Sequence, residues 1–124
     1  MSHPLVLVVD DDAPILTLMK NILREFGFDT RLASTGEAAL HAVKERTPDL
    51  ILVDKNMPGM SGEEVIRALR AQHGLSQLPI LILSGEPVDR SELARIGATA
   101  AVQKPFDVPS LVEQIRAHVG VTPA

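Results

Sequence analysis

The chain has 124 residues, of which 45% are hydrophobic and 23% are charged, and its formal net charge at pH 7 is −4. This length and composition fit a single globular domain with a core of its own, and the net acidity argues against direct binding to nucleic acids. The sequence contains no cysteine and no apolar run near the roughly 20 residues that cross a bilayer. We therefore expect a cytoplasmic protein without disulfides or membrane contact.

The first part of the chain predicts two strand–helix pairs. Residues 5–9 are a short run of aliphatic side chains, which is typical of a strand buried on both faces. Residues 15–26 then place apolar side chains on one face of a helix, for which Asp12 is the expected N-cap. Residues 28–33 mix polar and apolar side chains, as an edge strand does. Ser34 begins the expected capping box of the second helix.

Three further strand–helix pairs are expected. Residues 50–53 are four branched aliphatic residues between Pro48 and Met57-Pro58-Gly59, and they predict a buried strand that ends at Asp54. The fourth and fifth strands are expected over residues 79–83 and 100–102. The helices that follow the three strands are expected to start after Ser61, near Val88 and after Asp107.

Strand and helix thus alternate five times, which predicts an α/β fold with a parallel sheet covered by helices on both faces. The two least apolar strands, the second and the fifth, are the expected edges of that sheet. We predict one domain over residues 1–124, with a structured core over about 4–119 and a tail over 120–124.

Polar side chains follow four of the five predicted strands. Asp10 and Asp11 follow the first strand, Asp54 the third, Ser84 the fourth and Lys104 the fifth. The carboxyl ends of parallel strands share one rim of a sheet, so these side chains are expected to converge. Two carboxylates about 4 Å apart repel by about 4 kcal/mol at an effective dielectric constant of about 20. A positive charge must therefore balance the three aspartates.

Lys104 and a divalent cation are the two candidates for that positive charge. The site offers hard oxygen ligands, while His3, His41, His73 and His118 are scattered and expected at the surface. Oxygen ligands of this kind favour Mg²⁺ or Mn²⁺ over zinc. Because Mg²⁺ keeps positions open for water and a phosphoryl oxygen, the pattern predicts phosphoryl transfer with Asp54 as the reacting group.

At these positions the sequence resembles the receiver domain of bacterial two-component response regulators, of the stand-alone, chemotaxis-like type. The resemblance extends over essentially the whole chain and depends on motifs in a fixed order: Val8-Val9-Asp10-Asp11, Leu52-Val53-Asp54 with Met57-Pro58-Gly59, Ser84, and Lys104-Pro105-Phe106. It implies a flavodoxin-like (βα)5 three-layer sandwich with strand order 2-1-3-4-5. It also implies a phosphorylation-dependent signalling switch that is not an enzyme in the ordinary sense.

The resemblance assigns roles to individual residues. Asp54 would accept a phosphoryl group from a sensor histidine kinase or a phosphotransfer protein. Asp10, Asp11 and Asp54, with the backbone carbonyl of Asn56, would bind Mg²⁺ or Mn²⁺. Lys104 would contact the phosphoryl oxygens, and the peptide bond before Pro105 would be cis.

Three other residues are expected to control the switch. By the same resemblance, Ser84 would move to bond the phosphoryl group, while Asn56 and Glu86 would tune hydrolysis and give a lifetime of seconds to minutes. Ala101 occupies a position where many receivers have Tyr or Phe, so an aromatic switch is not possible there. We expect the signal to pass through residues 85–87 and the next helix to a protein-binding face formed by the fourth helix, the fifth strand and the last helix.

Three alternatives stay open from the sequence. A flavin-binding module of the same fold needs a loop rich in Ser, Thr or Gly after the first strand, where this chain has three aspartates. A metal-dependent phosphatase needs a further general acid and a cap over its substrate. The chain could also be a receiver domain of a longer hybrid kinase or transcription regulator. Lys55, beside the proposed acceptor, is expected to face solvent.

Overall fold

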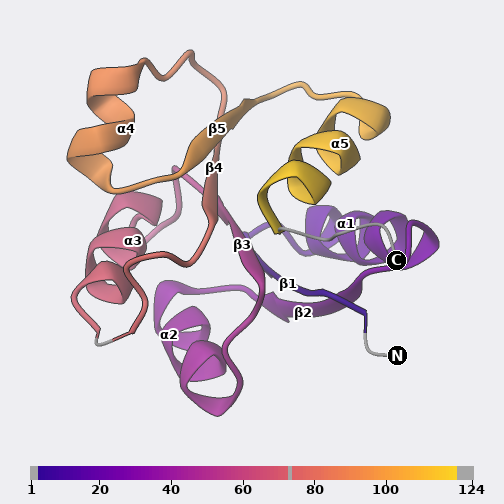
Figure 1. The fold of residues 1–124 in the computed structure, drawn as a ribbon, viewed down its shortest axis with the longest axis horizontal. Helices are drawn as coiled ribbons and strands as arrows, with labels where there is room; N and C mark the ends of the chain where they lie inside the picture. The colour runs from indigo at the N-terminus through magenta and orange to yellow at the C-terminus, as the bar shows by residue number, and fades with distance from the viewer. Residues whose placement is uncertain (1–2, 73, 120–124) are drawn as a thin grey trace.

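The computed structural model describes residues 3–72 and 74–119. Within them, strands and helices alternate from β1 to α5 (Figure 1). The strands are β1 (Leu5–Val9), β2 (Asp29–Ala33), β3 (Leu50–Asp54), β4 (Ile80–Ser84) and β5 (Ala100–Gln103). The helices are α1 (Ala13–Glu25), α2 (Gly36–Glu45), α3 (Gly62–Arg70), α4 (Arg90–Ile96) and α5 (Val108–Val119).

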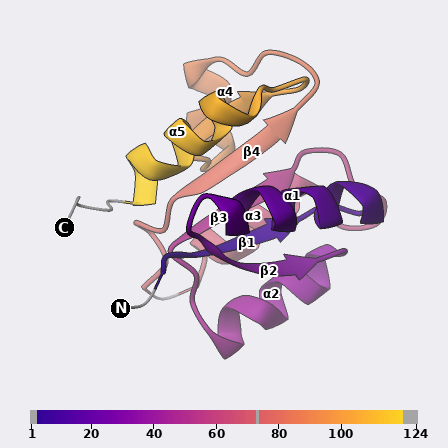
Figure 2. The same cartoon turned by 90° about the vertical axis from the view of Figure 1, so that its right-hand side faces the viewer.

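The strands form one parallel sheet in the order β2-β1-β3-β4-β5. Helices α1 and α5 pack on one face, and α2, α3 and α4 pack on the other. Figure 2 shows α1 and α5 on the viewer's side of the strands. The expected flavodoxin-like order is confirmed, and β2 and β5 are the edges, as their lower apolar content predicts.

The sheet divides the core into two layers of buried side chains. All five residues of β1, β3 and β4 are buried, as expected for central strands of a parallel sheet covered on both faces. Alternation along a strand sends Leu7 and Val9 into the layer under α2, α3 and α4, and Val6 and Val8 into the layer under α1 and α5. The hydrophobic runs of the sequence therefore fix both the strands and their packing.

Most helix starts follow the sequence pattern, and one does not. The Asp12 side chain caps α1 by accepting a hydrogen bond from Ile15 N at 3.3 Å. Ser61 forms a capping box with Glu64 at the start of α3. The prediction for Ser34 is wrong, because α2 begins one residue later and the Thr35 hydroxyl accepts from Ala38 N at 3.0 Å. Adjacent hydroxyl residues offer alternative caps, and Thr35 takes this role in the structure.

Helix α4 is the shortest helix of the described chain, and Ile96 is its one fully buried residue. Asp89 caps it by accepting from Glu92 N at 2.8 Å, so α4 starts slightly later than the predicted position near Val88. In the part of the chain that the structure describes, no helix is both long enough and apolar enough to cross a membrane. His3 and His41 are exposed and His118 is half-buried, whereas His73 and the expected tail lie outside the described residues.

Candidate functional site

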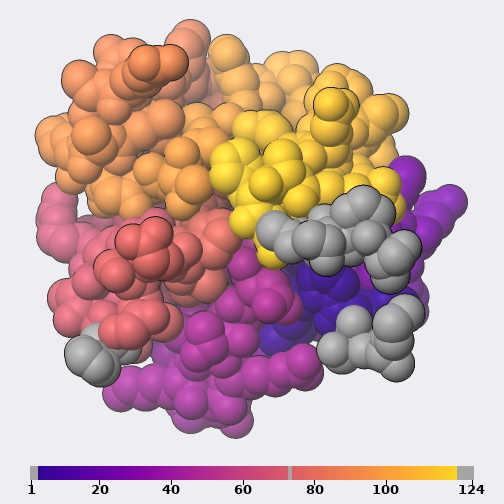
Figure 3. Space-filling model, viewed as in Figure 1, coloured from indigo at the N-terminus to yellow at the C-terminus, as the bar shows by residue number. Residues whose placement is uncertain are grey.

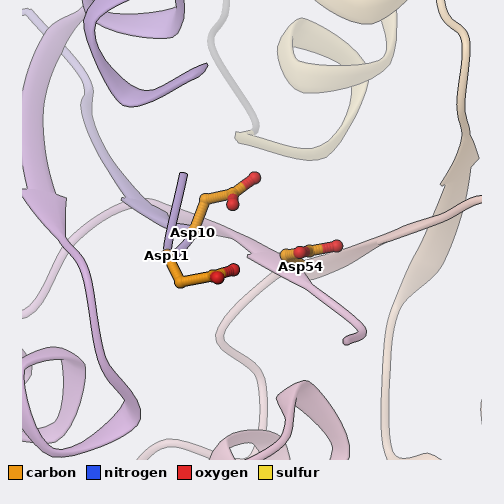
Figure 4. Close-up of side chains that lie close together, drawn as sticks. All are labelled: Asp10, Asp11 and Asp54. Carbon is orange, nitrogen blue, oxygen red and sulfur yellow. The ribbon is translucent and has the colours of Figure 1, made fainter. Parts of the chain in front are cut away.

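Three carboxylates meet at the carboxyl ends of β1 and β3. These strands are neighbours in the sheet, with Val9 in register with Val53, so the residues that follow them lie side by side. Asp10, Asp11 and Asp54 each offer a carboxylate oxygen within 4.8 Å of the others (Figure 4). Asp10 and Asp54 are buried, with 1% and 8% of their surface exposed, while Asp11 is exposed.

The Lys104 amine lies against this cluster of aspartates. Its Nζ is 3.0 Å from Asp54 Oδ1 and 4.0 Å from Asp10 Oδ2. The backbone N–H of Lys104 donates to the Ser84 carbonyl at 2.7 Å, which holds the loop after β5 against the end of β4. The Lys104–Pro105 peptide bond is cis. One ammonium therefore faces three carboxylates, which leaves an excess of negative charge.

Asp10 shows where a further cation is needed. Its Oδ1 accepts from the Asp12 backbone N–H at 3.0 Å, but its Oδ2 is buried and has no hydrogen-bond partner among the described residues. Burial raises the pKa of Asp10, the Asp12 N–H opposes that rise, and the charge of Asp54 adds to it. A buried, unpartnered carboxylate oxygen beside two other carboxylates fits Mg²⁺ or Mn²⁺ better than it fits the metal-free state.

Replacing Asp10 by Asn is expected to stabilise the metal-free protein at pH 7 by about 1 kcal/mol, because it removes a buried charge whose Oδ2 has no hydrogen-bond partner among the described residues. A folded-state pKa that is raised gives stability at low pH that is lost as the pH rises through that pKa. The gain should therefore be present at pH 7 and disappear in acid. Urea unfolding in EDTA at both pH values measures it.

The same variant should lose the stabilisation that Mg²⁺ gives the wild type, since one of the oxygen ligands becomes a neutral amide. Unfolding with and without Mg²⁺ separates the two effects. An Asn variant that is less stable than the wild type in EDTA, and gains as much from Mg²⁺, would contradict this account of the site.

The other predicted site residues lie on the same rim in different environments. Ser84 is 2% exposed at the end of β4, and Leu83 beside it is in register with Asp54. The Ser84 hydroxyl accepts from the Glu86 backbone N–H at 3.1 Å. Asn56 and Glu86 are exposed in the loops after β3 and β4. Their predicted effect on hydrolysis stays a prediction.

The structure differs from the sequence prediction at Lys55. Its side chain is only 22% exposed, and its Nζ lies 3.0 Å from Glu92 Oε2 on α4. This hydrogen bond raises the pKa of Lys55. Arg95 on α4 lies 3.8 Å from Glu92 and 3.5 Å from Glu63 on α3. An ion-pair network thus joins the residue after Asp54 to two helices.

Gly62, the first residue of α3, is a site residue that the sequence analysis missed. A Cβ at this position would lie 2.2 Å from the Asp54 carbonyl oxygen and 2.9 Å from Lys55 Cα. The Gly62 N–H donates to the Lys55 carbonyl at 3.1 Å. The loop after β3 therefore folds back onto the backbone of Asp54, and only glycine permits that approach. The sequence of residues 61–64 predicted the cap of α3 but not the contact of Gly62 with the Asp54 backbone.

Comparison with known proteins identifies the family. A family model described as the response regulator receiver domain matches residues 6–116. The chain belongs to this family. Receiver domains are signalling switches of two-component systems that bind Mg²⁺ in an acidic site and interact with histidine kinases or phosphotransfer proteins. The match confirms the predicted family, and it favours the receiver interpretation over the flavin module and the phosphatase.

The chain matches different shares of two curated relatives. This receiver domain is 41% identical over 116 residues to the DNA-binding response regulator MtrA of Mycobacterium tuberculosis, a match that covers 92% of the chain and 50% of MtrA. The chain thus spans about half the length of the first curated relatives that it matches. It is 34% identical over 113 residues to the chemotaxis protein CheY-3 of Vibrio cholerae, and this match covers 89% of the chain and 87% of CheY-3.

Solved structures show the same fold. The chemotaxis protein CheY4 of Vibrio cholerae superposes with a TM-score of 0.89 at 31% identity, covering 94% of this chain and 99% of CheY4. The receiver domain of the sensor histidine kinase PA1611 from Pseudomonas aeruginosa superposes with a TM-score of 0.86 at 25% identity, covering 97% of this chain and 100% of that domain. The latter structure has a magnesium ion coordinated in its active site cleft.

Proposed function

We propose that this receiver domain is a phosphorylation-dependent switch in which Asp54 accepts a phosphoryl group from a histidine kinase or a phosphotransfer protein. One observation supports it above the others: the Asp54 carboxylate is buried at the end of a central strand, between two further carboxylates and the Lys104 amine at 3.0 Å. The transfer breaks the P–N bond of a phosphohistidine and forms a P–O bond to Asp54.

The residues around Asp54 have separate tasks in this reaction. The Lys104 amine pairs with the Asp54 carboxylate and then balances charge on the phosphoryl oxygens. Asp10, Asp11 and Asp54, with the backbone carbonyl of Asn56, would hold Mg²⁺, which supplies further charge neutralisation when bound. The burial of Asp54 restricts the access of water to the acyl phosphate. Hydrolysis ends the signal in seconds to minutes, tuned by the exposed side chains of Asn56 and Glu86.

The proposal is tested by incubating the protein with acetyl phosphate and Mg²⁺ and measuring its intact mass. One added phosphoryl group is expected, and EDTA should prevent the addition. Borohydride reduces an aspartyl phosphate to homoserine, so peptide mapping then locates the acceptor without any substitution. Homoserine at position 54 is the expected product. An unmodified protein, or homoserine at another position, would contradict the proposal.

Ser84 and α4 would pass the conformational effect of phosphorylation to the protein-binding face. The Ser84 hydroxyl accepts from Glu86 N in this structure, and that bond changes if Ser84 turns to donate to a phosphoryl oxygen. Residues 85–87 are followed by Val88, by the N-cap Asp89 and then by α4, which is also tied to Lys55 through Glu92. We propose that downstream proteins bind the face formed by α4, β5 and α5. Figure 3 shows α4 and α5, in orange and yellow, in the upper half of this view of the surface.

Replacing Glu92 by Gln is expected to loosen α4 without preventing phosphorylation. The substitution removes the partner of Lys55, an ion pair that is worth up to about 1 kcal/mol where it is partly exposed. Hydrogen exchange of the amides in residues 90–96 should become a few-fold faster, while the mass gain with acetyl phosphate persists. The matched control is Glu113→Gln, an exposed carboxylate on α5 that forms no ion pair within the described chain. Equal exchange in both variants would contradict a role for the pair.

The role of the domain depends on whether it acts alone or as part of a longer protein. A receiver domain of a longer hybrid kinase or transcription regulator is the second candidate, because the chain spans half of MtrA and resembles the receiver domain of a sensor histidine kinase. In either case we propose a cytoplasmic module that acts through protein contacts, with no nucleic-acid or membrane contact of its own. Phosphotransfer from a panel of histidine kinases, compared by initial rate, would identify the donor.

A further inference from the structure

A second concave site lies at the opposite end of the sheet from the aspartates. It is a hollow of about 380 Å³ between the last turns of α1, the start of β2 and the residue that follows α2. Leu5 and Asp29, the first residues of β1 and β2, are in register and both line it. Asp10 follows the other end of β1 and Asp54 is the last residue of β3, so the two sites are separate. Helix α1 and strand β2 can be followed side by side in Figures 1 and 2.

Four cations line this hollow, although the chain as a whole is acidic. They are Lys20 and Arg24 on α1, Arg31 on β2, and Arg46 after α2. Arg31 pairs with Glu45. Across residues 3–72 and 74–119, no carboxylate lies within ion-pair distance of the other three cations, and Asp29 is the one acidic side chain of the lining.

The cations that line the hollow carry like charges close to one another. Lys20 and Arg24 are one helical turn apart on the same face of α1, where like charges repel. Arg46, directly after α2, lines the same hollow, so its charge adds to theirs. An anion in the hollow would relieve this repulsion, and guanidinium groups suit phosphate because they donate two parallel hydrogen bonds.

Size and lining narrow the class of anion. The volume is within the range of small-molecule sites and exceeds what a single phosphate group occupies. Thr30 adds a polar residue to the lining, and the buried Phe28 adds an apolar one. We propose that this hollow binds a polyphosphate anion, either as free pyrophosphate or as the phosphate chain of a nucleotide. This inference is independent of the proposed function of Asp54.

Calorimetric titration with pyrophosphate, ATP and orthophosphate tests the proposal. EDTA keeps metal away from the aspartates, and constant ionic strength separates site binding from general screening. The wild type should bind pyrophosphate or ATP more tightly than orthophosphate, and the tighter of the two identifies the free or the nucleotide form. The double variant Lys20→Gln/Arg24→Gln should bind at least about tenfold more weakly. NMR amide shifts should cluster at Leu5, Thr30 and Arg31.

The matched control is Arg67→Gln, which removes an exposed cation from α3, outside the hollow, and should leave the affinity unchanged. Circular dichroism shows whether each variant folds. Absence of binding at millimolar polyphosphate would overturn the proposal, as would equal weakening by Arg67→Gln or amide shifts elsewhere. Binding of polyaspartate or of anionic vesicles without binding of polyphosphates would also overturn it, and would indicate an acidic protein or a membrane as the ligand.

Discussion

The Asp54→Asn variant is expected to gain no phosphoryl mass with acetyl phosphate and Mg²⁺ under conditions that label the wild type. An amide oxygen is a poor nucleophile, and the substitution removes the carboxylate that lies 3.0 Å from the Lys104 amine. The loss should be complete rather than partial, because Asp10 and Asp11 would remain as metal ligands without an acceptor. Because Asn has nearly the same shape as Asp, the fold should persist, which circular dichroism would check.

Asp12→Asn is the matched control for this experiment. Asp12 follows the same strand as Asp10 and Asp11, but its side chain caps α1 and it is not part of the three-carboxylate cluster. Asn caps helices about as well as Asp does, so this variant should be labelled like the wild type. Equal labelling of Asp54→Asn and the wild type would move the acceptor to another residue. Loss of labelling in Asp12→Asn would mean that the site extends beyond the cluster.

The Gly62→Ala variant is expected to be destabilised by about 2–3 kcal/mol and to be phosphorylated poorly. The added methyl group would lie 2.2 Å from the Asp54 carbonyl oxygen and 2.9 Å from Lys55 Cα, and both are backbone atoms that cannot rotate away. Relieving the overlap must move either α3 or the end of β3, which displaces Asp54 from Lys104. Urea unfolding and the rate of labelling by acetyl phosphate measure the two effects.

Gly85→Ala provides the control for a glycine next to the site. An added Cβ at Gly85, which directly follows Ser84, would meet no atom within 4 Å. Its free energy of unfolding should stay within about 0.5 kcal/mol of the wild type, and labelling should persist. If Gly62→Ala has the same free energy of unfolding and the same labelling rate as Gly85→Ala, the close approach of α3 to Asp54 is not needed for stability or for phosphorylation.

The fold and the three-carboxylate cluster were predictable because each depends on a short local pattern. The run of residues 50–53 lies between Pro48 and Met57-Pro58-Gly59, which favours a strand buried on both faces, and a polar residue at the end of such a strand is expected at the rim of the sheet. Asp10, Asp54 and Lys104 could therefore be placed together despite their separation in the sequence. The structure shows this placement, and the family match accounts for the motif order.

The features that sequence analysis missed depend on distances between loops. The pairing of Lys55 with Glu92 requires the position of α4 relative to β3, which no local pattern encodes. Arg70 is a second example: its guanidinium donates to the carbonyls of Gly97, Leu75 and Leu78 and thereby ties two loops together, although its sequence context is that of a surface helix. The Ser34 error has a different cause, since the local sequence offered two equivalent caps.

Helix α4 buries few side chains against the sheet, and this has a consequence for signalling. Most of the free energy that holds a helix on a sheet comes from its buried apolar side chains, and α4 supplies only Ile96 in full. Displacing this helix removes one buried side chain from the core layer under α2, α3 and α4, whereas each of the other four helices of the described chain supplies at least three. A chemical modification or a bound target therefore has less packing energy to overcome in moving α4 than in moving any other helix.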